Sequence, residues 1–259
     1  MGFLTDLVGG RRRELELHPL DDSMLLARAF ALPPARDFVG ALRVHAGRPA
    51  VIAEVKRASP SAGAIADRDP AERARAYASA GAAAISVLTE QAHFHGSLAD
   101  LRAARMACAL PVLRKDFLIH PSELIESRAA GADAVLLIAA CLSANELAAM
   151  LATARDLGLG VLVEMHSDPD LEKVLASDAE VIGVNARDLE TLDVDVDRAL
   201  KHLARIPEGR LAVMESGIAT RDDVRAAVDA GASAILVGEA LMRADDPEAK
   251  LRELLGEES

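Results

Sequence analysis

Basic residues are in short supply in this chain of 259 residues. It carries 29 lysines and arginines against 41 aspartates and glutamates, which gives a net charge of −12. Nucleic acids and anionic membranes require a broad basic surface on their partner, so the composition argues against both. A phosphorylated small molecule needs only a few local donors, and the charge balance leaves room for such a substrate.

Cysteines and long apolar runs are also scarce. The two cysteines, Cys108 and Cys141, stand in apolar surroundings, which indicates reduced thiols and no disulfide framework. The longest apolar run, Ala134–Leu142, is far shorter than the ~20 residues of a membrane helix. The first 13 residues place their basic cluster after the apolar residues, the reverse of a signal peptide. We therefore expect a soluble, cytoplasmic protein.

A repeated transition from helix to strand is what the sequence does contain. An Ala-Gly-Ala step follows an amphipathic stretch and precedes an apolar run at Gly81, Gly131 and Gly231. Gly158 and Gly160 are expected to do the same before the apolar run at 161–163. The pattern is typical of a helix that ends at a left-handed glycine and leads into a buried strand.

Eight short apolar runs are the predicted strands. They lie near residues 51–55, 84–88, 112–114, 134–138, 161–163, 181–184, 211–214 and 234–237. The amphipathic stretches between them predict helices, among them 70–80, 98–108, 121–130, 144–157 and 221–230. Eight alternating units without a break in composition favour an α/β fold, a closed (β/α)8 TIM barrel, over an open sheet.

The residues before the first strand are left over from the barrel. Residues 1–48 are predicted to form an N-terminal helical extension, with helices at 23–31 and 37–45. Residues 49–259 then form the barrel, and no linker divides the chain. We expect one single domain.

Polar residues gather where the predicted strands end. The first strand ends in Glu54 and Lys56, which alternation places on one face, and small residues at 59–63 follow. In a barrel of this kind the carboxyl ends of the strands meet at one active site. The residues expected to share this cup are two lysines, three glutamates, an asparagine and a serine, namely Lys56, Lys115, Glu54, Glu164, Glu215, Asn185 and Ser216. Lysines among carboxylates in a partly dry cup suit general acid–base catalysis.

Two further features narrow the substrate. Gly217 follows the seventh strand and Gly238-Glu239 follows the eighth, in the loops where such barrels commonly bind phosphate. Phe94 and Phe117 fall just beyond strand ends, where they fit the walls of a site for a flat ring or, alternatively, packing beneath a loop.

No metal site is expected from the sequence. The two histidines that flank Phe94 are interpreted as loop structure, and the alternating aspartates of 193–197 as a solvated stretch that leads into a helix cap. His166 shares a face with Glu164 and is compatible with a position at the rim.

Seven motifs, in order along the chain, resemble those of the indole-3-glycerol-phosphate synthase family. They are AEVKRASPSAG at 53–63, FHGSL at 94–98, LRKDFLI at 113–119, LVEMH at 162–166, GVNARDL at 183–189, ESGI at 215–218 and LVGEALMR at 236–243. The resemblance spans roughly residue 37 to the C-terminus. It implies an enzyme of tryptophan biosynthesis that uses no metal or organic cofactor. We expect a monomer, with an oligomer as the open alternative. The enzyme would convert 1-(2-carboxyphenylamino)-1-deoxyribulose 5-phosphate to indole-3-glycerol phosphate, CO2 and water.

The resemblance also implies roles for individual residues. Lys115 would be the general acid that protonates the ketone, and Glu164 the base or charge-stabilising carboxylate, with Glu54 and Lys56 assisting dehydration and positioning. The phosphate would be bound by Lys56, Ser59 and the backbone of Gly217, Gly238 and Glu239. Polar groups around the carboxylated ring and the ribulose hydroxyls would come from Asn185, Arg187, Glu215 and Ser216. The apolar side would be lined by Phe94, Phe117, Leu136 and Leu189.

Two positions depart from the family's pattern. Ala186 follows Asn185 where many members carry a second asparagine, and alternation turns Ala186 away from the cup, so we expect it to be tolerated. Glu239 stands where a small hydroxyl residue is common, and its carboxylate is expected to point away from the phosphate and leave only its N–H to bind.

Three other functions compete with this interpretation. Phosphoribosylanthranilate isomerase, a barrel of the same pathway, relies on a Cys/Asp pair, and neither cysteine falls at the end of the first strand. A Schiff-base aldolase would use one desolvated lysine as its nucleophile. A catalytically silent barrel that binds a phosphorylated metabolite or a partner would have no use for buried lysines and glutamates.

Overall fold

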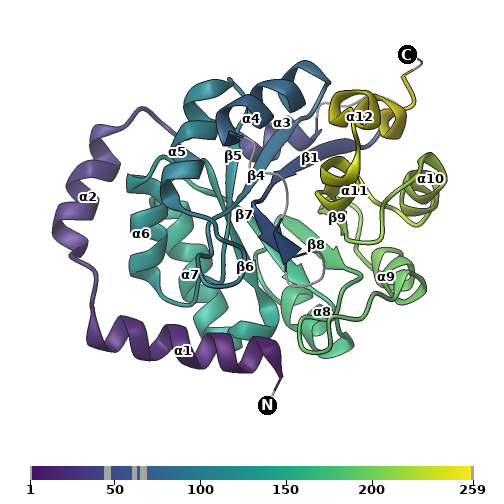
Figure 1. Ribbon diagram of the computed structural model, residues 1–259. Coiled ribbons are helices and arrows are strands. Elements are labelled where there is room, and N and C mark those ends of the chain that lie inside the picture. The colour runs from purple at the N-terminus through teal and green to yellow at the C-terminus, as the bar shows by residue number, and fades with distance from the viewer. Residues whose placement is uncertain (1, 44–47, 60–62, 65–68, 258–259) are drawn as a thin grey trace.

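The computed structural model describes residues 2–43, 48–59, 63–64 and 69–257, of which residues 58, 59, 63 and 64 are described by their backbone alone. Eight parallel strands close into a barrel (Figure 1). They are β1 (Ala50–Val55), β4 (Ala84–Leu88), β5 (Val112–Lys115), β6 (Ala134–Ile138), β7 (Gly160–Met165), β8 (Val181–Asn185), β9 (Leu211–Glu215) and β10 (Ala234–Val237). Every predicted strand is present within two residues at each end, so the prediction of a (β/α)8 barrel is confirmed.

The first and last strands close the barrel. β1 pairs with β4 on one side, with Ile52 opposite Ala84, and with β10 on the other, with Ala50 opposite Ala234. A short antiparallel pair, β2 (Ala58–Ser59) and β3 (Gly63–Ala64), follows β1. The residues at the end of β1 therefore lie beside those at the end of β10, although the two strands stand at opposite ends of the barrel sequence.

Helices alternate with the strands and surround the barrel (Figure 1). They are α4 (Pro70–Ser79), α5 (Leu98–Ala107), α6 (Pro121–Ala129), α7 (Ala144–Asp156), α8 (Asp168–Leu175), α9 (Val196–Leu203), α10 (Arg221–Asp229), α11 (Glu239–Arg243) and α12 (Pro247–Leu255), with a 3-10 turn η1 (Ala139–Cys141) after β6. The five helices predicted by range are confirmed within one residue. None of the described helices combines the length and the apolar character needed to cross a lipid bilayer.

Glycines end several of these helices as predicted. Gly81, Gly131, Gly158 and Gly231 have φ angles of 91°, 96°, 68° and 105°, in the left-handed region that glycine adopts without strain. The same expectation for Gly160 is wrong, because this residue begins β7. A Cβ at Gly160 would lie only 2.9 Å from the Cβ of Phe38, so the missing side chain here makes room for the buried Phe38.

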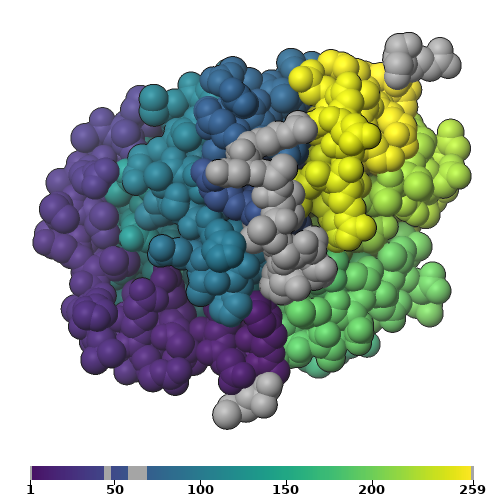
Figure 2. Space-filling model, in the orientation of Figure 1, coloured from purple at the N-terminus to yellow at the C-terminus, as the bar shows by residue number. Residues whose placement is uncertain are grey.

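Among the described residues, three helices precede the barrel. α2 (Asp22–Ala31) and α3 (Phe38–Arg43) match the two predicted helices, apart from residues 44 and 45, which lie outside the described residues. α1 (Phe3–Leu17) was not predicted. In Figure 2 the purple N-terminal helices and the yellow C-terminal helices lie on opposite sides of the molecule.

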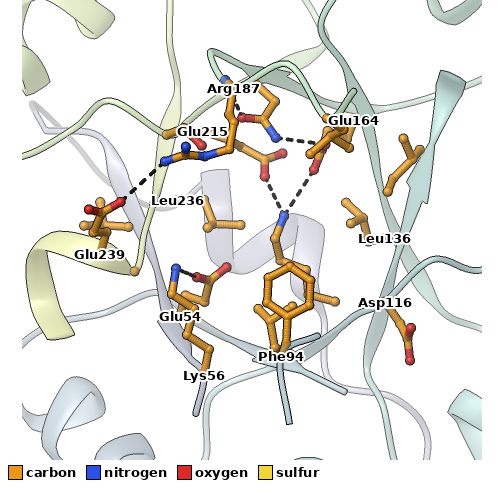
Figure 3. Close-up of a pocket in the computed structure, with 18 of the residues that line it drawn as sticks. Glu54, Lys56, Phe94, Asp116, Leu136, Glu164, Arg187, Glu215, Leu236 and Glu239 are labelled. Atoms are coloured by element: carbon orange, nitrogen blue, oxygen red, sulfur yellow. Dashed lines mark hydrogen bonds and ion pairs between the residues drawn. The ribbon is translucent and has the colours of Figure 1, made fainter. Parts of the chain in front are cut away.

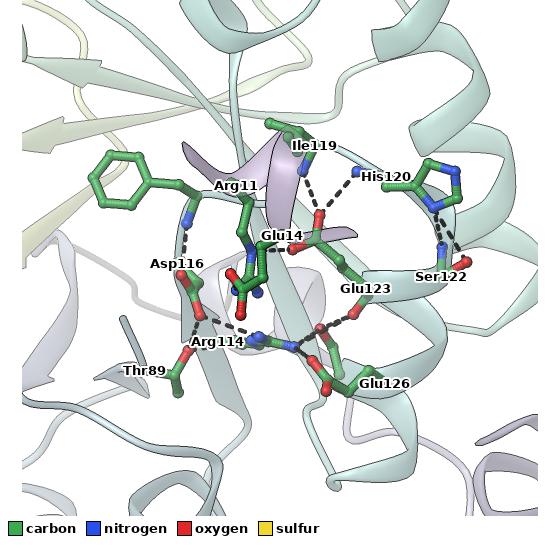
Figure 4. Close-up of polar contacts among 12 residues, drawn as sticks. Arg11, Glu14, Thr89, Arg114, Asp116, Ile119, His120, Ser122, Glu123 and Glu126 are labelled. Atoms are coloured by element: carbon green, nitrogen blue, oxygen red, sulfur yellow. Dashed lines mark hydrogen bonds and ion pairs between the residues drawn. The ribbon is translucent and has the colours of Figure 1, made fainter. Parts of the chain in front are cut away.

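A buried polar network holds α1 against the barrel (Figure 4). Arg11 Nε donates to Glu123 Oε1 at 2.7 Å, and the side chain of Glu123 is fully buried. The other oxygen of Glu123 accepts from the backbone N–H groups of Ile119 and His120 at 2.8 and 2.9 Å, at the N-terminus of α6. The ion pair thus fastens α1 to α6, and the second oxygen of Glu123 joins both to the loop that leaves β5.

The same network fixes the end of β5. Arg114 is buried and donates to Asp116 at 3.1 Å and to Glu126 on α6 at 2.8 Å. Asp116 also accepts a hydrogen bond from the backbone N–H of Phe117 at 2.9 Å. Since Lys115 stands between Arg114 and Asp116, its backbone is held on both sides by buried charged groups.

Candidate active site

All seven polar strand-end residues expected to meet do line one pocket (Figure 3). The cavity measures about 150 Å³ and lies at the carboxyl ends of the barrel strands. The sequence prediction of a shared cup is therefore confirmed in its geometry, and the pocket also has a broad apolar wall.

Lys115 lies at the centre of the polar part of the pocket. Its Nζ donates to Glu164 Oε2 at 3.1 Å and to Glu215 Oε2 at 3.0 Å. Burial alone would lower the pKa of Lys115, but the carboxylates of Glu164, Glu215 and Glu54 outweigh burial and raise it above its ordinary value. Lys115 is therefore a protonated lysine at neutral pH. Asn185 Nδ2 donates to the second oxygen of Glu164 at 2.9 Å and so orients that carboxylate.

The carboxyl group of Glu215 has a raised pKa. Burial, and after it the neighbouring charge of Glu164, raises the pKa of Glu215 to about 8 against the opposing influence of Lys115. Its Oε1 is buried and has no hydrogen-bond partner among the described residues. This oxygen lies over Gly183, where a Cβ would approach it to 2.1 Å. The lack of a side chain at Gly183 therefore makes room for the carboxyl group of Glu215.

Glu54 and Lys56 form a second charged pair at the end of β1. Lys56 Nζ lies 2.8 Å from Glu54 Oε1, and both side chains are largely buried. Burial would raise the pKa of Glu54, but Lys56 and Lys115 hold it below its ordinary value, so Glu54 is ionised. A Cβ at Gly238 would lie 2.2 Å from Glu54 Oε1. This glycine, directly after β10, therefore makes room for the carboxylate on β1.

The loop after β8 carries Arg187 to the pocket mouth. The backbone N–H of Arg187 donates to Asn185 Oδ1 at 2.9 Å, and its guanidinium donates to the carbonyl of Leu192 at 2.9 Å. The same guanidinium contacts Glu239 Oε2 at 3.4 Å, as the dashed line on the left of Figure 3 shows. Ser216 and Gly217, with φ angles of 64° and 73°, form the tight turn after β9 on the same side.

The apolar wall contains all four of the predicted apolar residues. Phe94, Phe117, Leu136 and Leu189 line the pocket. The rings of Phe94 and Phe117 lie 6.4 Å apart between centroids. Further apolar lining comes from Phe3, Leu88, Ile138, Leu192, Ile218, Leu236 and Val237. A polar centre beside such a wall suits a substrate with a flat apolar ring and anionic groups.

Comparison with known proteins identifies the family. A family model described as indole-3-glycerol phosphate synthase matches residues 4–254. The chain belongs to the indole-3-glycerol phosphate synthase family. The resemblance stated from the sequence motifs is thereby confirmed.

Individual relatives agree with the family model. The indole-3-glycerol phosphate synthase of a Nocardioides species is 48% identical over 262 residues, which cover 100% of both chains. That of Polaromonas naphthalenivorans is 51% identical over 225 residues, 86% of each chain. A solved structure of a mutant tryptophan synthase alpha-subunit from Pyrococcus furiosus has a TM-score of 0.62 at 15% identity and covers 80% of this chain and 98% of its own. This last likeness concerns the fold alone.

Several residues considered in the sequence of this indole-3-glycerol phosphate synthase family member are not found in the pocket lining. His166 is not part of the lining, and its ring nitrogens lie 3.4 Å from Asp170 and 3.8 Å from Asp188. Its position at the rim stays a prediction. Ala186 is fully buried and does not line the pocket, as alternation predicted. Asp195 caps α9 as expected. The side chain of Ser59 lies outside the described residues.

The sequence did not predict one aromatic residue of the pocket wall, Phe3. Phe3, at the start of α1, lies edge-on to Phe117 with ring centroids 6.5 Å apart and lines the pocket. Its ring also lies edge-on to His93 with centroids 5.0 Å apart, so both of its aromatic partners are far from it in the sequence. The one available signal was the apolar Phe3 and Leu4 at the start of a segment rich in charged residues.

Proposed function

We propose that this chain closes the indole ring of 1-(2-carboxyphenylamino)-1-deoxyribulose 5-phosphate, with loss of CO2 and water, to give indole-3-glycerol phosphate. Family membership supports this reaction, and one observation carries the mechanism. Lys115, held protonated between Glu164 and Glu215, faces a pocket with an apolar wall on one side and two glycine turns on the other.

Lys115 is the general acid of the proposed mechanism. The ring carbon that bears the carboxylate attacks the ketone carbon, and Lys115 delivers a proton to the ketone oxygen as that bond forms. The raised pKa keeps Lys115 in the acid form that this step needs. The carboxylate then leaves as CO2, its bonding electrons returning to the ring.

Dehydration completes the proposed reaction. Glu164, oriented by Asn185, acts as the base or charge-stabilising carboxylate, and Glu54 and Lys56 assist loss of the hydroxyl group and positioning. Arg187, Glu215 and Ser216 complete the polar contacts to the carboxylated ring and the ribulose hydroxyls. The flat ring packs on Phe94, Phe117, Leu136 and Leu189.

The phosphate is assigned to the side of the pocket where β1, β9 and β10 end. Lys56 supplies a cation there, and the turns at Gly217 and Gly238-Glu239 supply backbone N–H groups. Ser59 belongs to the same proposed set. A cytoplasmic location, a monomeric state and a single domain stay predictions.

The decisive test is product formation from the anilino-ribulose phosphate, followed by indole fluorescence. Lys115→Ala and Glu164→Gln should each lower turnover by at least ~100-fold, the lower range for general acid–base groups. Lys250→Ala, which removes a lysine paired with Glu253 on α12, is the matched control and should leave turnover unchanged. Wild-type turnover in both active-site variants would refute the assignment.

Schiff-base chemistry is disfavoured by the surroundings of Lys115. A nucleophilic lysine must lose its proton, and the carboxylate of Glu164, 3.1 Å from the Lys115 Nζ, opposes that loss. Borohydride should therefore trap no lysine adduct during turnover. A folded protein that forms no indole product would instead favour the silent-barrel alternative.

A further inference from the structure

We propose that Glu239 is an exchangeable counter-ion of Arg187: it holds the guanidinium in the empty site, gives it up to an anionic group of the substrate, and remains paired with Arg243. This inference rests on the proposed function and concerns how tightly the site binds its anionic substrate.

Glu239 lies between two arginines at the pocket mouth. It begins α11 directly after Gly238 and lines the pocket. Its Oε2 lies 3.4 Å from Arg187 Nη2, and its Oε1 lies 2.7 Å from Arg243 Nη2. The contact to Arg243 is thus the closer one, and the contact to Arg187 is long for a charge-assisted hydrogen bond.

The difference between the two contacts makes the exchange feasible. A carboxylate or phosphate of the substrate can approach the planar fork of Arg187 with two parallel hydrogen bonds, which is better geometry than the single 3.4 Å contact to Glu239. The side chain of Arg243 is 68% exposed, and it keeps the Glu239 charge paired after the contact with Arg187 is broken. The carbonyl of Leu192 continues to hold the other arm of Arg187 at 2.9 Å.

The charge of the pocket gives this counter-ion its effect on affinity. The described lining contains five acidic and three basic residues, namely Glu54, Asp116, Glu164, Glu215, Glu239, Lys56, Lys115 and Arg187. Asp116 is paired with Arg114 away from the centre of the charged cluster, and burial raises the pKa of Glu215 to about 8. At neutral pH three carboxylates then face three cations, so the described lining offers an anion no excess of positive charge. Of these three carboxylates, Glu239 is the one whose arginine partners, Arg187 and Arg243, lie at the pocket mouth.

The proposal predicts that substitutions at Glu239 and at Arg243 change the affinity for anions in opposite directions. E239Q keeps the shape of the side chain and removes its charge, so KM and the inhibition constant for inorganic phosphate should both fall about five- to tenfold, as expected for removing one charge near a surface-exposed anion. R243A should raise both constants about threefold, because Glu239 then depends on Arg187 alone. Arg243 lies outside the pocket lining and is assigned no step of the reaction, so kcat should change less than about twofold in R243A.

A double-mutant cycle provides the decisive measurement. KM and the phosphate inhibition constant are measured at low and high salt for wild type, E239Q, R243A and the double variant. We expect R243A to have little effect once Glu239 has lost its charge, and all differences to shrink at high salt. E239S, which restores the small hydroxyl residue common in the family, should behave as E239Q and covers the case in which E239Q folds poorly.

Three outcomes would overturn the proposal or its basis. An active wild type whose KM and phosphate constant do not change in E239Q would refute the counter-ion role alone. An equal R243A effect with and without the Glu239 charge would do the same, because it would show that Arg243 acts independently. A folded wild type that forms no indole-3-glycerol phosphate would instead refute the proposed function itself.

Discussion

Adding a single methyl group at Gly183, which does not line the pocket, should displace a carboxyl group of the active site. Gly183 lies on β8 beneath Glu215 and does not line the pocket. In Gly183→Ala the new Cβ would lie 2.1 Å from Glu215 Oε1 and 3.2 Å from its Cδ. Ordinary contacts of this kind are about 3.5 Å, so the carboxyl group must move by more than about 1 Å.

The magnitude follows from the contact that is then lost. Lys115 donates to Glu215 Oε2 at 3.0 Å, and a shift of that size breaks a hydrogen bond of this length. Hydrogen bonds to charged groups contribute about 1.5–3 kcal/mol, and about 1.4 kcal/mol corresponds to a factor of ten in rate. We therefore expect kcat/KM to fall roughly 10- to 150-fold. Crowding should also lower the free energy of unfolding by about 1–3 kcal/mol.

A pH profile distinguishes this mechanism from general damage. Glu215 is one of the carboxylates that raise the pKa of Lys115, so its displacement should move the alkaline limb of the kcat profile to lower pH. Gly10→Ala in α1 is the control, because a Cβ there meets nothing within 4 Å. It should leave activity and profile unchanged. A folded Gly183→Ala protein with wild-type kcat/KM would show that Glu215 is not held where the structure places it.

Three further predictions concern stability and reactivity. Burial raises the pKa of Glu215 to about 8 from an ordinary 4.5, so between these two pH values the folded state binds a proton that the unfolded state has lost. The free energy of unfolding should therefore fall as pH rises through this window, by at most about 1.4 kcal/mol per pH unit. Urea unfolding of Glu215→Gln should lack that slope. Arg11→Met removes the partner of a fully buried carboxylate and should lower the free energy of unfolding by about 1–3 kcal/mol, whereas Arg12→Met, in an exposed pair, should change it by less than about 0.5 kcal/mol. Burial raises the pKa of the Cys141 thiol to about 12, so iodoacetamide followed by mass spectrometry should modify the more exposed Cys108 and leave Cys141 unmodified until the protein unfolds.

The barrel could be predicted because its signals are local. Continuous apolar runs, amphipathic stretches and helix-ending glycines each fall within one element, and the strand ends then follow from the topology. The seven polar residues of the cup needed no further information, since equivalent positions on parallel strands converge in a closed barrel. This is why the lysine and glutamate positions agree with the sequence prediction.

The features that escaped prediction depend on contacts between distant segments. α1 contains Gly9 and Gly10 followed by three arginines, a weak helical pattern, and it is fastened by the Arg11 ion pair to α6. The wall position of Phe3 rests on ring contacts with His93 and Phe117, which are equally distant along the chain. The contact between Arg187 and Glu239 joins the loop after β8 to the start of α11, and no spacing along the chain reveals it.

The pairing of β1 with β10 has a consequence for the order in which the protein is made on the ribosome. Lys56 and its partner Glu54 leave the ribosome early. Gly238, which makes room for the Glu54 carboxylate, is among the last barrel residues to emerge. Until then β1 has an unpaired edge, and a nascent chain of seven barrel strands cannot complete the charged pocket. A truncated chain should therefore lack activity altogether rather than retain part of it, and its open edge makes it a substrate for chaperones and proteases.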